Sequence, residues 1–264
     1  MNPDARTGGH TARRRFGQNF LTSPGIVSRI VEAIHPHPGE NVVEIGPGLG
    51  ALTRPLLERL GHLHVIEIDR DLIARLREHY DPGCLTIHEG DALEFDFGAL
   101  CMGEKPSLRV VGNLPYNIST PLLFHLADFA SRLRDGHFML QKEVVMRMVA
   151  APGTAEYGRL SVMLQYHFQM ERLFDVPPGA FRPAPKVTSS IVRMTPLPAG
   201  TYAAHDEARF ARVVAAAFAQ RRKTLRNTLR DFLDETSLKA LGFDPGLRGE
   251  RLSVADFVAI ANAC

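Results

Sequence analysis

The sequence predicts an α/β fold with a mostly parallel sheet, an antiparallel edge and a small all-α C-terminal domain. Three observations lead to this prediction. Between residues 41 and 140, short apolar runs alternate with segments whose leucines recur at helical spacing. Between residues 160 and 194, strand-like runs follow one another without a clear helix. After residue 200 the pattern is helical throughout.

The composition is that of a globular protein with a sizeable core: 264 residues, 45% hydrophobic and 23% charged. The formal net charge is only +2, so an anionic partner must be met by local clusters of basic side chains. Cys84, Cys101 and Cys264 lie far apart and form no CxxC pair, which favours a reducing compartment. Because no apolar run approaches the roughly 18 residues needed to cross a bilayer, we expect a cytoplasmic protein without membrane contact.

Residues 1–15 are predicted to form a flexible N-terminal arm. The arm carries Arg13, Arg14 and Arg15 but no apolar segment follows them, so it is not a secretory signal. Ser23 and Pro24 then predict the start of a helix, with Ser23 at the N-cap and Pro24 at the first helical position.

The next segments alternate between strand and helix patterns. Strands are expected at residues 41–45, 64–68, 85–87, 108–111 and 137–140, and helices at 52–60, 72–76 and 121–129. Right-handed crossovers through the helices make these strands parallel. Two further strand-like runs, 160–168 and 187–194, are expected to close the sheet with an antiparallel edge.

A second domain is predicted beyond a proline-rich linker at residues 196–200. Helices are expected there at residues 210–218, 225–233 and 254–260. The sheet domain is therefore predicted to span residues 16–197 and the helical domain residues 201–264.

The first motif that carries chemistry is EIGPGLG at residues 44–50, between an apolar strand and a helix. Gly46 and Gly48 allow backbone N–H groups to approach a ligand closely. Such a turn lies at the carboxyl ends of the strands, where open α/β sheets bind their ligands. With Ala51 the spacing also satisfies the loose dinucleotide fingerprint, so an NAD-dependent oxidoreductase stays open at this point.

Carboxylates follow the next two strands. Glu67 ends the second strand about 20 residues further on, where a carboxylate accepts hydrogen bonds from a ribose diol. Asp91 follows the third strand and is placed to accept a hydrogen bond from an adenine amine. The plainer interpretations are a solvated strand-end carboxylate for Glu67 and a helix N-cap for Asp91.

The segment Asn113-Leu114-Pro115-Tyr116 follows the fourth strand at the same sheet edge. The ordered set of motifs resembles the class I S-adenosylmethionine-dependent methyltransferases, which have a Rossmann-like fold, and the Asn-Leu-Pro-Tyr segment is similar to that of enzymes that methylate exocyclic amines of adenine or cytosine. The adenine amine is a poor nucleophile because its lone pair is delocalised into the ring. Acceptance of its N–H groups by the Asn113 side chain and the Leu114 carbonyl would favour charge developing on nitrogen. Pro115 restricts Leu114 to extended conformations, and Tyr116 offers a face to a base that has left its stack.

A longer series of motifs narrows this resemblance. GQNFL, EIGPGLGALT, VIEID, GDAL, GNLPYNIST, LQKEV and FRPAPKV stand in this order between residues 16 and 194, and RRKTLRNTL follows in the helical region. Together they resemble the ribosomal RNA adenine N6,N6-dimethyltransferases, in particular the bacterial small-subunit branch. The resemblance covers nearly the whole chain. It implies a methyltransferase domain over residues 16–197 and a helical RNA-docking domain over 201–264.

The resemblance also implies roles for individual residues. Those expected to contact S-adenosylmethionine are Asn19, Leu21, Gly46, Gly48, Glu67, Asp91 and Asn113. Tyr116 and Phe181 are expected to stack on the flipped adenine, beside the catalytic Asn113 and Leu114. No metal is expected, because the histidines show no ligand spacing.

The family dimethylates two adjacent adenines in a hairpin loop near the 3′ end of small-subunit (16S) rRNA and is linked to late subunit assembly. The resemblance therefore implies an immature 30S ribosomal subunit as the partner, and we expect a monomer. A 23S rRNA adenine methyltransferase conferring antibiotic resistance and a non-catalytic assembly factor on the same fold are the alternatives. The oxidoreductase is disfavoured, because nothing after the fourth strand offers an acid or base for hydride transfer.

Basic residues gather in one stretch of the helical region. They are Arg221, Arg222, Lys223, Arg226 and Arg230. Arg222, Arg226 and Arg230 are expected to share one helical face, because they are spaced four residues apart. Together with the arginines of the N-terminal arm, the cluster suits phosphate contacts with salt-dependent binding. The alternative interpretation is a solvated helix face.

Overall fold

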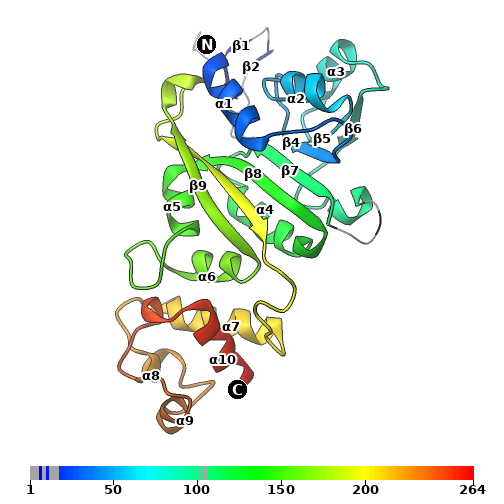
Figure 1. Ribbon diagram of the computed structural model, residues 1–264. Coiled ribbons are helices and arrows are strands. Elements are labelled where there is room, and N and C mark those ends of the chain that lie inside the picture. The colour runs from blue at the N-terminus through cyan, green and yellow to red at the C-terminus, as the bar shows by residue number, and fades with distance from the viewer. Residues whose placement is uncertain (1–5, 8–9, 12–17, 102, 104–105) are drawn as a thin grey trace. The chain divides into compact units, whose positions relative to one another are not determined.

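The computed structural model describes residues 6–7, 10–11, 18–101, 103 and 106–264. The chain divides into two compact units, each with its own core. The first unit holds the residues up to Val145 together with Met170–Pro196, and the second holds Met146–Gln169 and Leu197–Cys264. Figure 1 shows the sheet in the first unit and the helices α7 to α10 in the second.

The first unit is built on a seven-stranded sheet with the strand order β6-β5-β4-β7-β8-β11-β9. Its strands are β4 (Val42–Ile45), β5 (Leu63–Glu67), β6 (Leu85–Glu89), β7 (Leu108–Asn113), β8 (Leu133–Gln141), β9 (Phe168–Val176) and β11 (Ser189–Pro196). The pairs β4·β5, β4·β7, β5·β6 and β7·β8 are parallel, and β11 is antiparallel to β8. The predicted fold class, a mostly parallel Rossmann-like sheet with an antiparallel edge, is confirmed.

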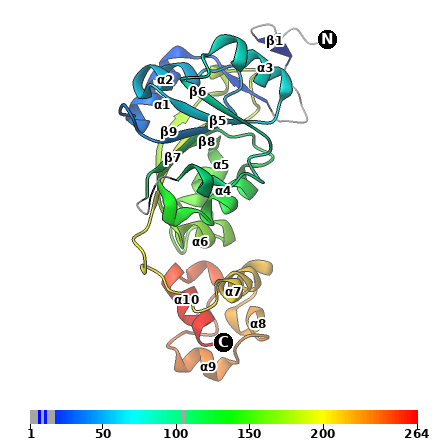
Figure 2. The same cartoon turned by 90° about the vertical axis from the view of Figure 1, so that its right-hand side faces the viewer.

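Helices lie before, between and after the parallel strands of the first unit. They are α1 (Pro24–Ile34), α2 (Thr53–Leu60), α3 (Arg70–His79), α4 (Ser119–Ala127) and α5 (Lys142–Met148), the last of which runs into the second unit. Figure 2 shows them around the sheet from a second direction. Helix α3 begins where the Asp69 side chain accepts a hydrogen bond from the Asp71 backbone. Ser23 and Pro24 occupy the N-cap and first position of α1, as predicted, but the Ser23 side chain makes no capping hydrogen bond.

Short strands tie distant segments to this unit. β3 (Phe20–Leu21) pairs antiparallel with β10 (Phe181–Arg182), and the segment before β10 contains the one-turn 3₁₀-helix η5 (Pro178–Ala180). Thr22 reinforces this junction, because its backbone N–H donates to the Ala180 carbonyl over 2.8 Å. The N-terminal segment therefore lies against the loop that leads into β11.

Part of the predicted N-terminal arm lies outside the described residues. The described part is the backbone of β1 (Arg6–Thr7) and β2 (His10–Thr11), which pair antiparallel. Arg13, Arg14 and Arg15 lie outside the described residues, as does Gly17, the first residue of the GQNFL motif. Within the part of the chain that the structure describes, no helix is both long and apolar enough to cross a membrane.

The core of the first unit explains why its strands are mostly apolar and show no alternation of apolar and polar residues. Residues 108–112 of β7 are all buried, as is the whole of β4. A strand covered on both faces has no solvent side on which polar residues would alternate. Helices α1 and α2 close one part of this core with Val31, Ile34 and Leu56.

The second unit is helical. Its elements are α6 (Arg159–Gln165), α7 (Glu207–Ala219), α8 (Leu225–Thr228), α9 (Glu235–Ala240), η6 (Gly249–Arg251) and α10 (Val254–Asn262). Helix α10 lies beside α7 in both views (Figures 1 and 2), and Phe210 and Phe257 are fully buried in their shared core. The chain passes from the first unit to the second for the last time between Pro196 and Leu197, next to the predicted domain boundary at residues 197–201. Residues 146–169 join the helical unit as well, because Val162 and Tyr166 pack into that same core.

Two predicted elements are wrong. Residues 160–168 were expected to form a strand, but residues 159–165 form helix α6. Leu160, Ser161, Val162 and Leu164 are all buried, so burial on several sides produced an alternating pattern without a strand. The strand β9 begins only at Phe168.

The predicted helix over 225–233 is also shorter than expected, since α8 ends at Thr228 and turns follow. Leu225, Leu229 and Leu233 are buried at the predicted spacing. After α8 the chain forms a separate turn, in which the Leu229 carbonyl accepts from the Phe232 and Leu233 backbones at 2.8 and 2.9 Å. The spacing of the leucines therefore predicted correctly which side chains are buried, but it did not predict where the helix ends.

Candidate active site at the carboxyl ends of the parallel strands

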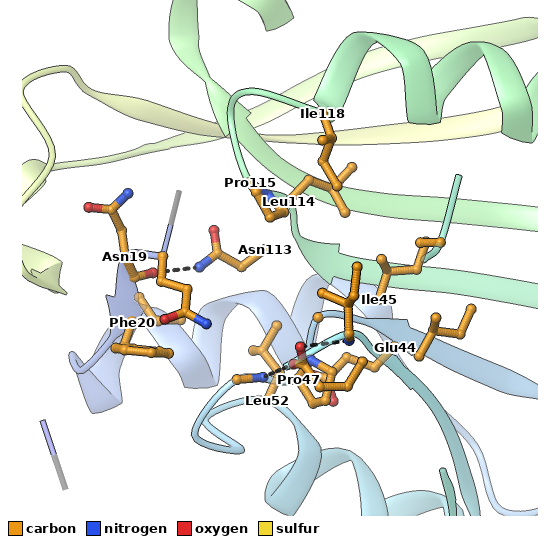
Figure 3. Close-up of a pocket in the computed structure, with 18 of the residues that line it drawn as sticks. Asn19, Phe20, Glu44, Ile45, Pro47, Leu52, Asn113, Leu114, Pro115 and Ile118 are labelled. Atoms are coloured by element: carbon orange, nitrogen blue, oxygen red, sulfur yellow. Dashed lines mark hydrogen bonds between the residues drawn. The ribbon is translucent and has the colours of Figure 1, made fainter. Parts of the chain in front are cut away.

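A pocket of about 300 Å³ lies at the carboxyl ends of β4, β5, β6 and β7. Its lining comes from five segments that are separate in the chain: residues 18–21, residues 44–49 with 51–52, residues 66–68, residues 90–92, and residues 113–118. Most of the predicted site residues line it, namely Asn19, Leu21, Gly46, Gly48, Glu67, Asp91, Asn113, Leu114 and Tyr116. Figure 3 shows how side chains from these segments face one another across the pocket.

The glycine-rich turn forms the floor nearest to β4. Gly46 and Gly48 have φ angles of 66° and 58°, a left-handed conformation that side-chain-bearing residues rarely adopt. A Cβ atom on Gly48 would lie 3.2 Å from the Phe20 ring, so this glycine also allows the N-terminal segment to pack closely on the turn. The turn is fixed at its start by the Gly46 N–H, which donates to the Ile66 carbonyl over 2.9 Å.

Glu67 lies buried at the end of β5, with 6% of its surface exposed. Its Oε1 accepts hydrogen bonds from the Ile68 and Asp69 backbones, each over 2.9 Å. Its Oε2 accepts one long hydrogen bond, of 3.4 Å from the Gly48 N–H, and no other from the residues that the structure describes. Burial is the main cause that raises the pKa of this carboxyl. One oxygen is thus committed to the backbone, and the other is available to hydroxyl donors in the pocket.

Asp91 lies at the edge of the pocket in the turn after β6. Its Oδ1 accepts from the Leu93 backbone over 2.9 Å. The residue therefore caps a turn rather than the α-helix considered from the sequence. A carboxylate can accept several hydrogen bonds, so this bond does not exclude a ligand contact.

Asn113 is the last residue of β7 and lines the pocket. Its Nδ2 donates to the Asn19 backbone carbonyl over 3.0 Å, as Figure 3 shows. Because the amide nitrogen is held in this way, the side-chain oxygen is the group left to accept a hydrogen bond. The next residue, Leu114, is held through its backbone N–H, which donates to the Met139 carbonyl of β8 over 3.2 Å.

Tyr116 is half-buried and lines the pocket. Its hydroxyl lies 2.7 Å from the Oγ of Ser189, at the start of β11. Burial raises the pKa of Tyr116, so the side chain is a neutral phenol at physiological pH. No local pattern in the sequence indicates the contact with Ser189, because the two residues are 73 positions apart.

Phe181 differs from its expected placement. It is fully buried in β10, where it pairs with Leu21, and it does not line the pocket. A ring with no exposed surface cannot stack on a base, so in this structure Phe181 supports the N-terminal segment instead. An aromatic residue in a proline-rich loop is expected to be exposed and able to stack on a base. Here the pairing of β10 with the distant strand β3 places Phe181 in the core.

Glu44 is a pocket residue that sequence reasoning did not single out. It belongs to β4, has 2% of its surface exposed and lines the pocket. Burial raises its pKa to about 7, the nearby Glu67 adds to this rise, and a 2.6 Å hydrogen bond from the Thr53 hydroxyl opposes it. A carboxylate inside the apolar run Val42–Ile45 was the available signal, because an acidic residue is rarely buried without a purpose.

The basic cluster of the second unit is exposed but does not form one helical face. Arg221, Arg222 and Lys223 precede α8, and Arg230 follows its end. The expected four-residue periodicity was therefore wrong, since only Arg226 lies within a helix. Three of these side chains also make contacts inside the unit: Arg221 donates to the Ala155 carbonyl, and Arg226 and Arg230 lie near Glu235 and Asp231.

Comparison with known proteins identifies a family and close relatives of this chain. The family model described as ribosomal RNA adenine dimethylase matches residues 9–264. The chain is 76% identical over 253 residues to the ribosomal RNA small subunit methyltransferase A of Aromatoleum aromaticum, which covers 96% of this chain and 94% of that protein. The protein of the same name from Thiobacillus denitrificans is 67% identical, over 95% of this chain and 97% of its own length.

Solved structures show the same fold. A dimethyladenosine transferase from Plasmodium falciparum superposes with a TM-score of 0.77 at 26% identity, over 91% of this chain and 95% of that one. The 23S rRNA methyltransferase ErmE has a TM-score of 0.67 at 24% identity, over 93% of this chain and 99% of its own. In the part of the chain that the structure describes, no group of three or more histidine, cysteine or acidic side chains is arranged to hold a metal ion.

Proposed function

The chain belongs to the ribosomal RNA adenine dimethylase family, and from that premise we propose that it transfers methyl groups from S-adenosylmethionine to the N6 amines of two adjacent adenines. The proposed targets lie in a hairpin loop near the 3′ end of 16S rRNA. The observation that carries this proposal is the position of Asn113, whose amide is oriented at the wall of a pocket that also holds the glycine turn and Glu67. Family membership also decides against the oxidoreductase that the glycine spacing left open.

The residues present fit an S-adenosyl cofactor. Glu67 offers a carboxylate oxygen for ribose hydroxyls, and Asp91 offers acceptors at the next strand end. The left-handed Gly46 and Gly48 let the backbone approach the ligand closely. Apolar side chains, among them Ile66 of β5, line the remaining wall, as expected for an adenine ring. When bound, the cofactor supplies an electrophilic methyl group on a sulfonium.

Catalysis then rests on acceptors that are already in place. The Asn113 side-chain oxygen and the Leu114 carbonyl are proposed to accept the two N–H groups of the target amine. Acceptance of these protons favours positive charge on the attacking nitrogen, and prepositioned dipoles achieve this without reorganisation. The Asn19 carbonyl contributes by holding the Asn113 amide in the accepting orientation. The sulfur leaves readily, so no strong base is needed to remove the proton beforehand.

Tyr116 is proposed as the platform for the target base. Its ring lines the pocket next to Asn113, and a base that has left its stack regains stacking energy on such a face. Phe181 is not included in this role because it is buried.

The experiment that tests the proposal is transfer of labelled methyl to immature 30S subunits, followed by mapping of the modified nucleotides. Label on N6 of two adjacent adenines of 16S rRNA is expected. Label confined to 23S rRNA, or the absence of transfer from a protein that binds subunits, would support the alternatives of a resistance methyltransferase or a non-catalytic assembly factor. Asn113→Ala is expected to lower kcat by at least about 100-fold while the protein stays folded, as found when a preorganised hydrogen-bond partner is removed. Wild-type rates from a folded Asn113→Ala protein would contradict the amide-acceptor mechanism.

The partner is proposed to be the immature small subunit in the cytoplasm, met by a monomer, with the second unit docking on RNA. Arg222 and Lys223 are exposed, and neither forms an ion pair with another of the described residues, so each can bind a phosphate without first breaking an ion pair of that kind. Their joint replacement by glutamine is expected to reduce the dependence of log K on log salt by about 2, because about one counterion is released for each phosphate contact. Binding isotherms at several salt concentrations measure this slope. Arg54→Gln on α2, another exposed arginine, is the control and is expected to leave the slope unchanged.

A further inference from the structure

Ser189 is a buried polar residue that no step of the reaction uses directly. It is fully buried at the first position of β11, and its Oγ lies 2.7 Å from the Tyr116 hydroxyl. This contact joins the loop after β7 to the antiparallel edge of the sheet. The pocket wall is therefore held from a part of the chain that contributes no pocket residue itself.

The surroundings of Ser189 keep its hydroxyl in a defined place. Its backbone is opposite Gln141 in the β8·β11 ladder. One residue earlier, the Thr188 carbonyl accepts from the Lys142 backbone over 2.9 Å. A serine side chain has one torsion, so a fixed backbone leaves the hydroxyl few positions.

The Tyr116 side chain, unlike that of Ser189, is not held in place by a β-ladder. It stands on a short loop between β7 and α4, whose Pro115 carbonyl accepts from the Ile118 backbone over 3.2 Å. Two side-chain torsions determine the ring plane, and stacking depends on that plane. The Tyr116 hydroxyl oxygen lies on the axis of the second torsion, so anchoring it to Ser189 fixes the direction of the ring through the first torsion. Because the O–H bond of a phenol lies in the plane of its ring, the same hydrogen bond favours the ring plane that contains the Ser189 oxygen.

We propose that Ser189 is the positioning residue for Tyr116: its hydroxyl holds the aromatic ring in the plane on which the target adenine stacks. This inference rests on the proposed function, since it requires Tyr116 to be the base platform. Ser189 does not touch the substrate. Its effect reaches the reaction only through the Tyr116 hydroxyl.

The test compares full-length Ser189→Ala, Tyr116→Phe and the double variant in methylation of immature 30S subunits. Each single variant is expected to raise KM for the subunit and to lower kcat, with a combined loss in kcat/KM of about five- to tenfold, as expected for one neutral hydrogen bond. KM for S-adenosylmethionine is expected to stay unchanged. The double variant is expected to be no worse than either single variant, because both remove the same bond.

Ser161→Ala is the matched control. Ser161 is also fully buried, and its hydroxyl bonds to the Arg147 carbonyl in the second unit. The Ser161 hydroxyl also accepts from the Gly158 backbone over 3.0 Å. The control therefore removes a buried hydroxyl at a site distant in sequence from Tyr116, and it is expected to lower stability without raising KM for the subunit. An equal rise in KM in this control would overturn the positioning role, as would losses that multiply in the double variant.

Two further outcomes separate the possible failures. If the wild-type protein does not label adenine N6, the proposed function fails before the role of Ser189 is reached. If the wild type labels adenine and Ser189→Ala equals it in both KM and kcat, the positioning role alone is wrong. If Ser189→Ala does not fold, Tyr116→Phe removes the same hydrogen bond by a change at the half-buried residue. Unchanged kinetics in Tyr116→Phe would then overturn the inference.

Discussion

Replacement of Glu44 by glutamine is expected to stabilise the folded protein above neutral pH while weakening its binding of S-adenosylmethionine. Glu44 is almost completely buried beneath the pocket, and burial raises its pKa to about 7 from an ordinary value of 4.5. Glutamine has nearly the same shape, and its side-chain carbonyl can still accept the 2.6 Å hydrogen bond from Thr53.

The magnitude follows from the rise in pKa. The carboxyl of Glu44 binds its proton more tightly in the folded state, so its favourable contribution to stability is fully present below pH 4.5 and is lost as the pH rises through about 7. At about 1.4 kcal/mol for each tenfold change in proton affinity, the loss amounts to about 3 kcal/mol. Glu44→Gln cannot ionise, so its advantage over the wild type is expected to grow from near zero at pH 4.5 to about 3 kcal/mol at pH 8.

The Glu44 carboxylate is also expected to favour binding of the cofactor. S-adenosylmethionine carries a positive sulfonium and an ammonium group, and an ionised carboxylate that lines the pocket favours a cation. Removal of this charge is expected to weaken binding by about tenfold or more, as for a hydrogen bond or pair that involves a charged group. Binding is also expected to release a proton near neutral pH, because the bound cation lowers the pKa of Glu44.

Urea unfolding of both proteins between pH 5 and pH 8, followed by circular dichroism, measures the stability difference. Calorimetric titration in two buffers of different ionisation enthalpy measures the released proton. Glu58→Gln is the control, since Glu58 is an exposed carboxylate on α2 paired with Arg54, and we expect it to change stability by less than about 1 kcal/mol. A stability difference between wild type and Glu44→Gln that does not vary with pH would refute this reasoning, as would cofactor binding without proton release in the wild type.

Two further predictions concern the first unit. Gly48→Ala is expected to cost about 1 kcal/mol of stability for its φ of 58° and additionally to weaken cofactor binding, because the new Cβ would press on the Phe20 ring at 3.2 Å. Gly39→Ala, at a φ of 77° with no atom near its Cβ, is expected to show the stability loss alone, and denaturant unfolding with cofactor titration compares the two. The pKa of His64 is lowered to about 4, chiefly by burial and then by its neighbouring histidines, so His64 stabilises the fold above pH 6.5 and this contribution is lost as the pH falls from 6.5 to 4. For a half-buried ring we expect only about 1 kcal/mol after screening by solvent; His64→Phe is expected to flatten the stability curve in this range, and an unchanged curve would contradict the assignment.

The parallel part of the fold was accessible from the sequence because its signals are local. Each buried strand is a short apolar run, and each crossover helix shows its own periodicity. The position of the site then followed from one topological rule, since the carboxyl ends of parallel strands meet at the same sheet edge. Gly46, Glu67, Asp91 and Asn113 were therefore expected near one another, and the structure places all of them on one pocket.

The predictions failed where a segment is buried by parts of the chain remote in sequence. Helix α6 has apolar and small side chains on several sides, so its pattern matched a strand. Phe181 has four prolines within four positions of it in the sequence, yet its pairing with Leu21 carries it into the core. In both cases the deciding contacts join residues far apart in the sequence, for which a linear pattern holds no signal.

The sequence by itself determined the fold class, the sheet edge that holds the site and the residue types that supply hydrogen-bond acceptors there. These depend on hydrophobic period, on glycine's freedom at positive φ and on the side-chain chemistry of Glu67 and Asn113. Tertiary structure alone decided which atoms are available: the Asn19 carbonyl orients the Asn113 amide, Ser189 restrains Tyr116, and burial raises the pKa of Glu44 to about 7. The physical reason is that hydrogen-bond partners and desolvation are properties of the space around a side chain, and that space is filled here by distant parts of the chain.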